Sequence, residues 1–214
     1  RSFDVVAPFK EHFVVDLSQP PQRALSSNHR EKARRGLKAV TVERSVEPIH
    51  WLDEWMVQYD QLVERHQISG ISAFSRRAFA RQLTIPGLVM FRALYEGKTV
   101  GATLWFCQGE VGYRHLAAFD DNGYALRASY ALDWQAIEYF ADQKLRWLHL
   151  GGGAGLKSNG SDGLSFYKRG WSTGAVPAYF CGRILNHARY CAIVASKRSA
   201  ASNYFPAYRA GEFG

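Results

Sequence analysis

Cysteine is scarce in this chain of 214 residues. The three cysteines, Cys107, Cys181 and Cys191, are an odd number and include no C-x-x-C pair. This pattern argues against a disulfide framework and offers no ligand spacing for structural zinc. We therefore expect reduced thiols, a cytoplasmic location and no bound metal.

Long apolar runs are also missing. No stretch approaches the roughly 20 apolar residues that span a bilayer, and no basic, apolar and small signal pattern opens the chain. Apolar residues still make up 47% of the chain and aromatic residues 14%, which excludes a disordered class. Length and composition predict one domain over residues 1–199 and an irregular C-terminal tail over residues 200–214.

Acidic residues are few near the C-terminus. Residues 163–214 carry seven Lys or Arg and one Asp or Glu, and the net charge of the whole chain is +8. Such basic segments favour a phosphate-bearing partner, for example RNA, CoA or a nucleotide-linked substrate. A surface charge that serves only solubility is the alternative.

The period of the apolar residues alternates between strand-like and helix-like along the chain. Strands are predicted at residues 12–17, 38–43, 88–95, 100–107, 111–119 and 146–150. Helices are predicted at about residues 26–36, 52–66, 75–83 and 126–143, with Gly70 and Ser72 as breakers after the second and residues 120–123 as a turn.

Connection lengths set the expected topology. Short glycine-containing loops join the three strands of residues 88–119 into an antiparallel meander. The helix that follows makes the strand at residues 146–150 parallel to the last meander strand.

This order of elements resembles the GNAT acyltransferase fold. The resemblance implies an α/β fold: a single GNAT-like domain with a mixed, mainly antiparallel sheet and flanking helices. In that fold the two parallel strands splay apart at their C-terminal ends, and the acyl donor binds in the gap. Here the gap is expected between residues 117–119 and 150–152, in keeping with ligand sites at the carboxyl ends of strands.

A more specific resemblance lies in residues 147–171, WLHLGGGAGLKSNGSDGLSFYKRGW. A hydrophobic strand, an LGGG turn and a downstream F-Y-K resemble the C-terminal signature of FemABX-like transferases, and the resemblance covers roughly residues 25–192. Those enzymes typically transfer an aminoacyl group from aminoacyl-tRNA to an amine, often on a peptidoglycan precursor. A full Fem protein has two GNAT-like domains, whereas this chain has room for one.

The FemABX resemblance also implies catalytic residues. Lys168 aligns with the lysine that stabilises the oxyanion of acyl transfer, and Tyr167 takes the aromatic place before it and is positioned to bond the donor. A surface lysine in a basic tail is the alternative for Lys168.

Residues of the meander are further candidates. His115 is a candidate base if the strand face that it shares with Tyr113 and Ala117 meets the acceptor. Trp105 and Tyr113 are candidate walls of the acceptor cleft. Core packing is the alternative for all three aromatic side chains.

Candidate substrate-binding residues lie in three other segments. Gly151, Gly152 and Gly153 permit a close approach of ligand, although a tight turn also explains them. The start of the helix after the meander offers groups that bind a phosphate. The basic helix near the N-terminus offers groups for phosphates or a tRNA backbone, and a solvated helix face is the alternative there. These residues are Arg127, Ser129, Tyr130, Arg30, Arg34 and Arg35.

The prediction is an N-acyltransferase that forms an amide bond, with aminoacyl-tRNA as donor and an amine on a small molecule or peptide as acceptor. No resident cofactor is expected, because the donor is a co-substrate. The R/Q-x-x-G-x-G/A loop of CoA-binding GNATs is absent from residues 122–129, which favours a donor other than acetyl-CoA. A CoA-dependent N-acyltransferase and a non-catalytic GNAT-like binding module are the alternatives, and the sequence does not specify an oligomeric state.

Overall fold

The computed structural model describes residues 2–70, 73–154, 162–197 and 202–211. The chain forms two compact units, His12–Val176 as one and Arg1–Glu11 with Pro177–Gly214 as the other. This division differs from the expected domain over residues 1–199 and tail over residues 200–214. Ser72 and the ends of that tail lie outside the described residues.

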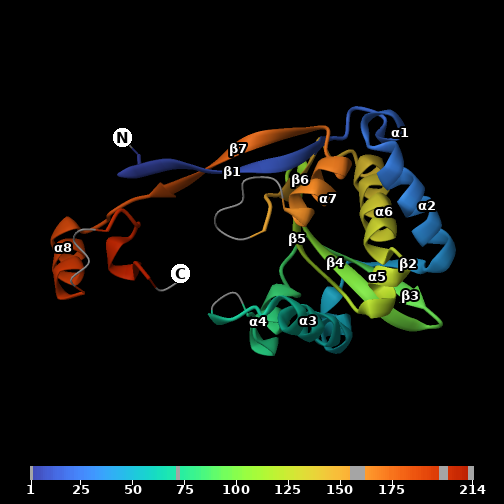
Figure 1. The fold of residues 1–214 in the computed structure, drawn as a ribbon, viewed down its shortest axis with the longest axis horizontal. Helices are drawn as coiled ribbons and strands as arrows, with labels where there is room; N and C mark the ends of the chain where they lie inside the picture. The colour runs from blue at the N-terminus through green and yellow to red at the C-terminus, as the bar shows by residue number, and fades with distance from the viewer. Residues whose placement is uncertain (1, 71–72, 155–161, 198–201, 212–214) are drawn as a thin grey trace. The chain divides into compact units, whose positions relative to one another are not determined.

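In the described residues, seven strands form one mixed sheet in the order β2-β3-β4-β5-β6-β1-β7 (Figure 1). Strands β5 and β6 are parallel, and the β2–β3, β3–β4, β4–β5 and β1–β6 pairs are antiparallel. The bounds are β1 Val5–Asp16, β2 Thr41–Ser45, β3 Leu88–Tyr95, β4 Lys98–Gln108, β5 Val111–Phe119, β6 Trp147–Gly151 and β7 Gly174–Gly182. The predicted α/β fold with a mainly antiparallel sheet is confirmed.

Helices cover both faces of the sheet within residues 12–176. Helices α2 and α6 lie side by side on one face, and α3 and α4 lie on the other (Figure 1). The bounds are α1 Pro21–Ala24, α2 Ser27–Ala39, α3 Leu52–His66, α4 Arg76–Gln82, α5 Asp121–Ala125, α6 Ala128–Asp142, α7 Gly163–Trp171 and α8 His187–Ser196, with 3-10 turns η1 Pro48–Trp51 and η3 Ala207–Arg209.

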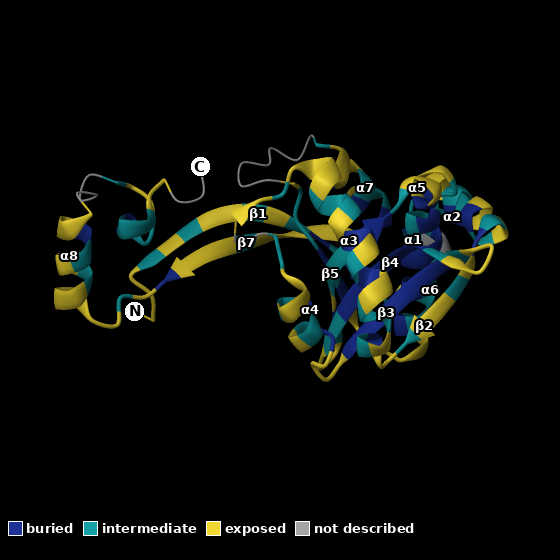
Figure 2. Ribbon diagram, turned by 90° about the horizontal axis from the view of Figure 1, so that it is seen from below, coloured by how far each residue is buried: buried dark blue, intermediate teal, exposed yellow. Residues whose placement is uncertain are grey.

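The central strands are buried on both faces, as Figure 2 shows for β3 and β4. Val89 and Phe91 pack in the cluster on the α6 side, whereas Leu88 and Met90 pack with Trp55 on the α3 side. This two-sided burial explains why β3 is a continuous apolar run instead of an alternating one.

Strand β5 departs from the expected alternation of side chains. Its register with β4 shifts between Leu104 and Trp105, where Trp105 pairs with Arg114 and Leu104 with Leu116. The shift is a β-bulge, which leaves His115 unpaired and changes the faces that follow. The prediction that His115 shares a face with Ala117 is therefore wrong, because His115 contacts α4 while Ala117 packs in the cluster on the α6 side.

The segment after β5 also differs from its prediction. Residues 120–123, expected as a turn, begin the short helix α5. Asp120 caps this helix, because its side chain accepts a hydrogen bond of 2.7 Å from the Gly123 amide.

Candidate active site

The two parallel strands separate soon after they begin. Their pairing joins Val111–Tyr113 to Trp147–His149 and continues no further in the described residues. A cavity of about 710 Å³ lies beyond this point, and we call it the strand-gap cavity. Its described lining is Leu62, His66, Ile68, Arg114, His115, Leu116, Ala117, Phe119, Tyr124, Ser129, Leu150, Ala154, Gly163, Leu164, Tyr167 and Lys168.

The lining comes from both layers of helices. Leu62 and His66 belong to α3 on one face of the sheet, whereas Ser129 of α6 and Tyr167 of α7 belong to the other. The strand-gap cavity thus passes between β5 and β6, at the place that the sequence predicted for ligand binding.

Lys168 reaches this cavity from α7. Its side chain is almost buried, at 9% exposure, and the Nζ donates a hydrogen bond of 2.7 Å to the carbonyl of Gly152. Gly151, at the end of β6, has a φ of +74°, and a Cβ built on it would lie 3.3 Å from that Nζ. The glycine turn and Lys168 therefore form one unit: the turn allows the close approach, and its carbonyl orients the ammonium group.

Helix α7 is held in place at its beginning. Asp162 accepts hydrogen bonds from the amide and the hydroxyl of Ser165, at 3.0 and 2.6 Å. This is an N-cap, which satisfies one of the amide groups that a helix start leaves without a partner. The cap fixes the first turn of the helix that carries Tyr167 and Lys168.

Tyr167 belongs to a buried polar network. Its hydroxyl donates to Asp133 of α6 at 2.8 Å, and the Nε of Arg114 donates to the other oxygen of the same carboxylate at 3.1 Å. Burial raises the pKa of Tyr167 well above its usual range, and the charge of Asp133 raises it further, so the phenol stays protonated. For Arg114, burial acts to lower the pKa, but the Asp133 carboxylate outweighs it and the pKa is raised.

His115 lies on the opposite side of the sheet from this network. Its Nε2 is 2.9 Å from the Oε1 of Gln82 on α4, and its ring contacts Phe106. An amide oxygen only accepts, so Nε2 carries the proton and Nδ1 keeps a lone pair. Burial lowers the pKa of His115, so the ring is neutral at pH 7.

His29 of α2 contacts α7. It is 2% exposed, and its Nε2 lies 3.0 Å from the carbonyl of Tyr167. Its ring packs edge-on against Tyr130 and Trp171. The sequence contained His29 within its basic segment, but nothing in the local pattern distinguished this residue from its neighbours.

Several predicted residues lie away from the strand-gap cavity. Trp105 is fully buried in the core, where its Nε1 donates to Thr103, and Tyr113 lies beside the ring of His149. Tyr130 packs between His29 and Tyr167.

The predicted basic residues also lie outside the described lining. Arg127 has a left-handed backbone and precedes α6, and Arg30 lies on α2. Arg34 and Arg35 pair with Glu31 on the surface of α2, at 2.6 and 2.9 Å.

Four of the predicted site residues belong to the described lining of the cavity, namely Ser129, Tyr167, Lys168 and His115. The glycines of residues 151–153 lie between Leu150 and Ala154, which both line it.

Sequence reasoning missed Arg114 and Asp133. The sequence shows an arginine within a strand and an aspartate within an apolar helix. Buried charges of this kind are usually paired, so these two residues were the available signal. Asp133 is in fact 4% exposed on its side chain, and Arg114 is 10% exposed.

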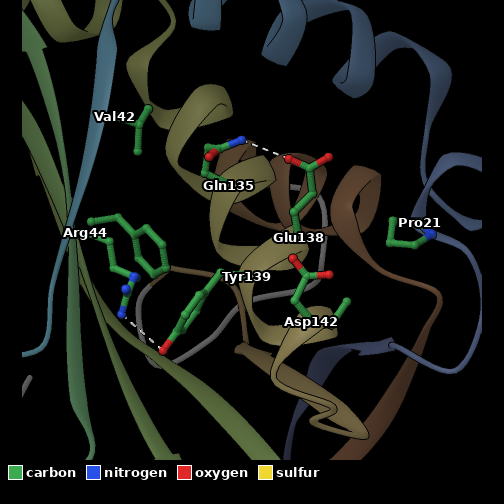
Figure 3. Close-up of a pocket in the computed structure, with 9 residues that line it drawn as sticks. Pro21, Val42, Arg44, Gln135, Glu138, Tyr139 and Asp142 are labelled. Carbon is green, nitrogen blue, oxygen red and sulfur yellow. Dashed lines mark hydrogen bonds between the residues drawn. The ribbon is translucent and has the colours of Figure 1, made fainter.

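A second cavity of about 600 Å³ lies between α6 and the strands β2 and β3 (Figure 3). Its polar groups mainly bind one another: Gln135 donates to Glu138, and Arg44 donates to the hydroxyl of Tyr139. Burial raises the pKa of Glu138, and the nearby charge of Asp142 raises it further. None of the predicted catalytic residues lines it, so the strand-gap cavity is the candidate active site.

The match to a known family agrees with this geometry. Residues 23–169, more than half of the chain, match the acetyltransferase (GNAT) domain family. The chain belongs to this family. GNAT membership confirms the fold expected from the order of elements, and no curated protein matches the sequence significantly.

Solved structures with the same fold include two from larger proteins. The C-terminal domain of a putative lysylphosphatidylglycerol synthetase from Agrobacterium fabrum has a TM-score of 0.63 at 14% identity, over 82% of this chain and 60% of that one. FemX has a TM-score of 0.63 at 13% identity, over 87% and 64%. This chain thus spans under two thirds of both structures, and the likeness at these identities shows the fold alone.

A third similar structure is close to this GNAT domain in length. An aminoglycoside acetyltransferase from an uncultured soil metagenomic sample, solved with sisomicin, has a TM-score of 0.51 at 15% identity. The match covers 70% of this chain and 98% of that one.

Within the described residues, none of the helices is long and apolar enough to cross a membrane.

Proposed function

We propose that this chain is an N-acyltransferase that moves an aminoacyl group from aminoacyl-tRNA to an amine on a small molecule or peptide. The observation that carries the proposal is the placement of the Lys168 Nζ, nearly buried in the strand-gap cavity and oriented by the Gly152 carbonyl. Structures of FemX and of a lysylphosphatidylglycerol synthetase domain support the aminoacyl donor through their common fold.

The proposed chemistry needs one positioned cation. The acceptor amine attacks the ester carbonyl of the donor and forms a tetrahedral intermediate with a negative oxygen. The Lys168 ammonium group stabilises this charge more in the transition state than in the ground state. The C–O bond of the ester then breaks, the amide forms, and the 3′-oxygen of the tRNA leaves as a hydroxyl with the proton that the amine loses.

His115 is the proposed acceptor of the amine proton. It lines the cavity, its ring is neutral at pH 7, and Gln82 holds the tautomer that leaves Nδ1 able to accept. The buried Tyr167 phenol, which donates to Asp133, is assigned to holding α7 and its lysine in place.

Substitution of Lys168 tests the proposal directly. The purified chain is incubated with a pool of charged tRNA and candidate amines, and amide formation is followed by mass spectrometry. Lys168→Met is expected to lower kcat by about 10²–10³-fold, the usual cost of losing one oxyanion-stabilising group. Lys38→Met, which removes an exposed lysine of α2, is the matched control and should keep the wild-type rate.

A CoA-dependent N-acyltransferase is the second candidate function. It is favoured by the family match and by the common fold with the aminoglycoside acetyltransferase. Calorimetric titration with acetyl-CoA and longer acyl-CoAs separates the two donors, because saturable micromolar binding would assign the cavity to CoA. A chain that turns over neither donor would contradict both and leave the non-catalytic binding module.

A further inference from the structure

The described lining of the strand-gap cavity contains cationic side chains and no carboxylate. The cations are Arg114 and Lys168, whereas burial keeps the ring of His115 neutral at pH 7. The remaining wall is largely apolar, with Leu116 and Leu150 on the two separated strands, and apolar walls strengthen the field of a nearby charge.

Arg114 uses only part of its hydrogen-bonding capacity within the protein. Its Nε donates to Asp133, and the side chain makes no other hydrogen bond or ion pair with the described residues. A guanidinium group has five N–H donors, so four of them, on the two terminal nitrogens, are left for a ligand. The side chain is nine-tenths buried and lines the cavity.

Asp133 occupies only one donor of Arg114. One carboxylate oxygen accepts from the Nε of Arg114 and the other accepts from the Tyr167 hydroxyl, and the phenol remains protonated. The two terminal nitrogens of the guanidinium group therefore remain able to bind an anion.

We propose that Arg114 binds an anionic group, a carboxylate or a phosphate, of the substrate that enters the strand-gap cavity from the α6–α7 side. The planar guanidinium fork matches both groups, because each offers two oxygens to parallel N–H donors. The inference rests on the proposed function in that this ligand is one of the two substrates of the transfer. It adds that this substrate carries a negative charge close to its reacting group.

Titration with small anions tests the inference without any acyl transfer. The full chain is titrated at constant ionic strength with sodium phosphate and, separately, with sodium N-acetylglycinate. Binding is followed by NMR shifts of the arginine side chains and of the amides of residues 113–118. We expect saturable shifts, and the anion that binds more tightly identifies the group as phosphate or carboxylate.

The variants take account of the buried ion pair. Removing Arg114 alone leaves Asp133 uncompensated, at a cost typical of about 3–5 kcal/mol. We therefore use Arg114→Lys, which keeps the charge but loses the fork, and the neutral double variant Arg114→Gln with Asp133→Asn. Arg146→Lys is the control, because Arg146 also pairs with an aspartate but lies outside the described cavity lining.

The Kd is expected to rise at least about tenfold in both Arg114 variants, the loss typical of a charged hydrogen bond, and to stay unchanged in Arg146→Lys. Absence of shifts with either anion, or wild-type Kd values in both Arg114 variants, would overturn the inference. Anion binding through Arg114 in a chain that transfers no acyl group would contradict the proposed function and leave this site standing.

Discussion

The packing of His29 sets how closely α7 approaches α2. A Cβ built on Gly170 of α7 would lie 2.1 Å from the ring of His29, far inside van der Waals contact. The ring itself is held by Tyr130 and Trp171 and has little room to move. A glycine is therefore needed at this position, although glycine costs helix stability.

Gly170→Ala is expected to destabilise the protein by about 1–3 kcal/mol, because the added methyl group overpacks a filled core. Gly163→Ala is the matched change in the same helix, where a Cβ meets no atom of the described residues within 4 Å. It should be neutral or slightly stabilising. Urea unfolding followed by tryptophan fluorescence compares the two, since all six tryptophans lie in residues 12–176. Equal free energies of unfolding in the two variants would show that the His29 ring moves to make room for the added methyl group.

Functional residues differ in how far they could be predicted. A local motif pointed to Lys168 and Tyr167, which both line the candidate site. The pairing of Arg114 with Asp133 was not predicted, because it depends on the packing of α6 against β5. The face of His115 was predicted wrongly because the bulge is a property of two strands together, and a single strand pattern does not show it.

At the scale of elements, α7 is the part on which the site depends. It presents Tyr167 and Lys168 to the cavity, and it is held by the Asp162 cap at its start and by the contact of His29 with Tyr167 at its middle. A change that loosens α7 should therefore affect activity more than an equal loss of stability elsewhere.

Removal of the Asp162 cap tests this dependence. Asp162→Ala should cost about 1 kcal/mol of stability and also lower kcat, because the first turn of α7 is no longer fixed. Ser75→Ala removes a comparable cap from α4, where the serine side chain accepts from Ala78. It should cost a similar free energy of unfolding with a smaller loss of kcat, because among the described residues α4 reaches the site only through Gln82 at its other end. A similar loss of kcat in both variants would contradict a special role for α7.

Most elements of residues 12–176 were predictable. Strands β3 and β5 have their predicted bounds, because apolar runs between glycine-containing turns are a strong strand signal. Strand β7 and the first half of β1 were missed. Each contains a proline, Pro177 and Pro8, and proline within a run argues against a regular strand.

At the scale of the whole molecule, three histidines link stability to pH. Burial lowers the pKa of His29, His115 and His149 below the ordinary value of 6.5. Between that value and the lower folded values, the unfolded chain binds more protons than the native one. Stability is thus complete above about pH 6.5 and falls as the pH drops through the folded pKa values.

We expect the free energy of unfolding in urea to be lower at pH 5.5 than at pH 7.5. The lowered pKa values of Asp16 and Glu31 change stability only below the ordinary values of 3.8 and 4.5 for these groups, outside this window. The raised pKa of Glu138 acts in the opposite direction, above 4.5. A His29→Gln variant should show a weaker fall with pH than the wild type. An unchanged slope would mean that His29 does not contribute to it.

The two-layer lining of the strand-gap cavity has a kinetic consequence for the proposed transfer. Two molecules that approach from opposite layers of the sheet need not share one entrance, so neither has to depart before the other arrives. Both substrates are then bound together when the amide forms, and no covalent acyl-enzyme intermediate is required. Initial rates measured against both substrates should accordingly give intersecting lines in double-reciprocal plots.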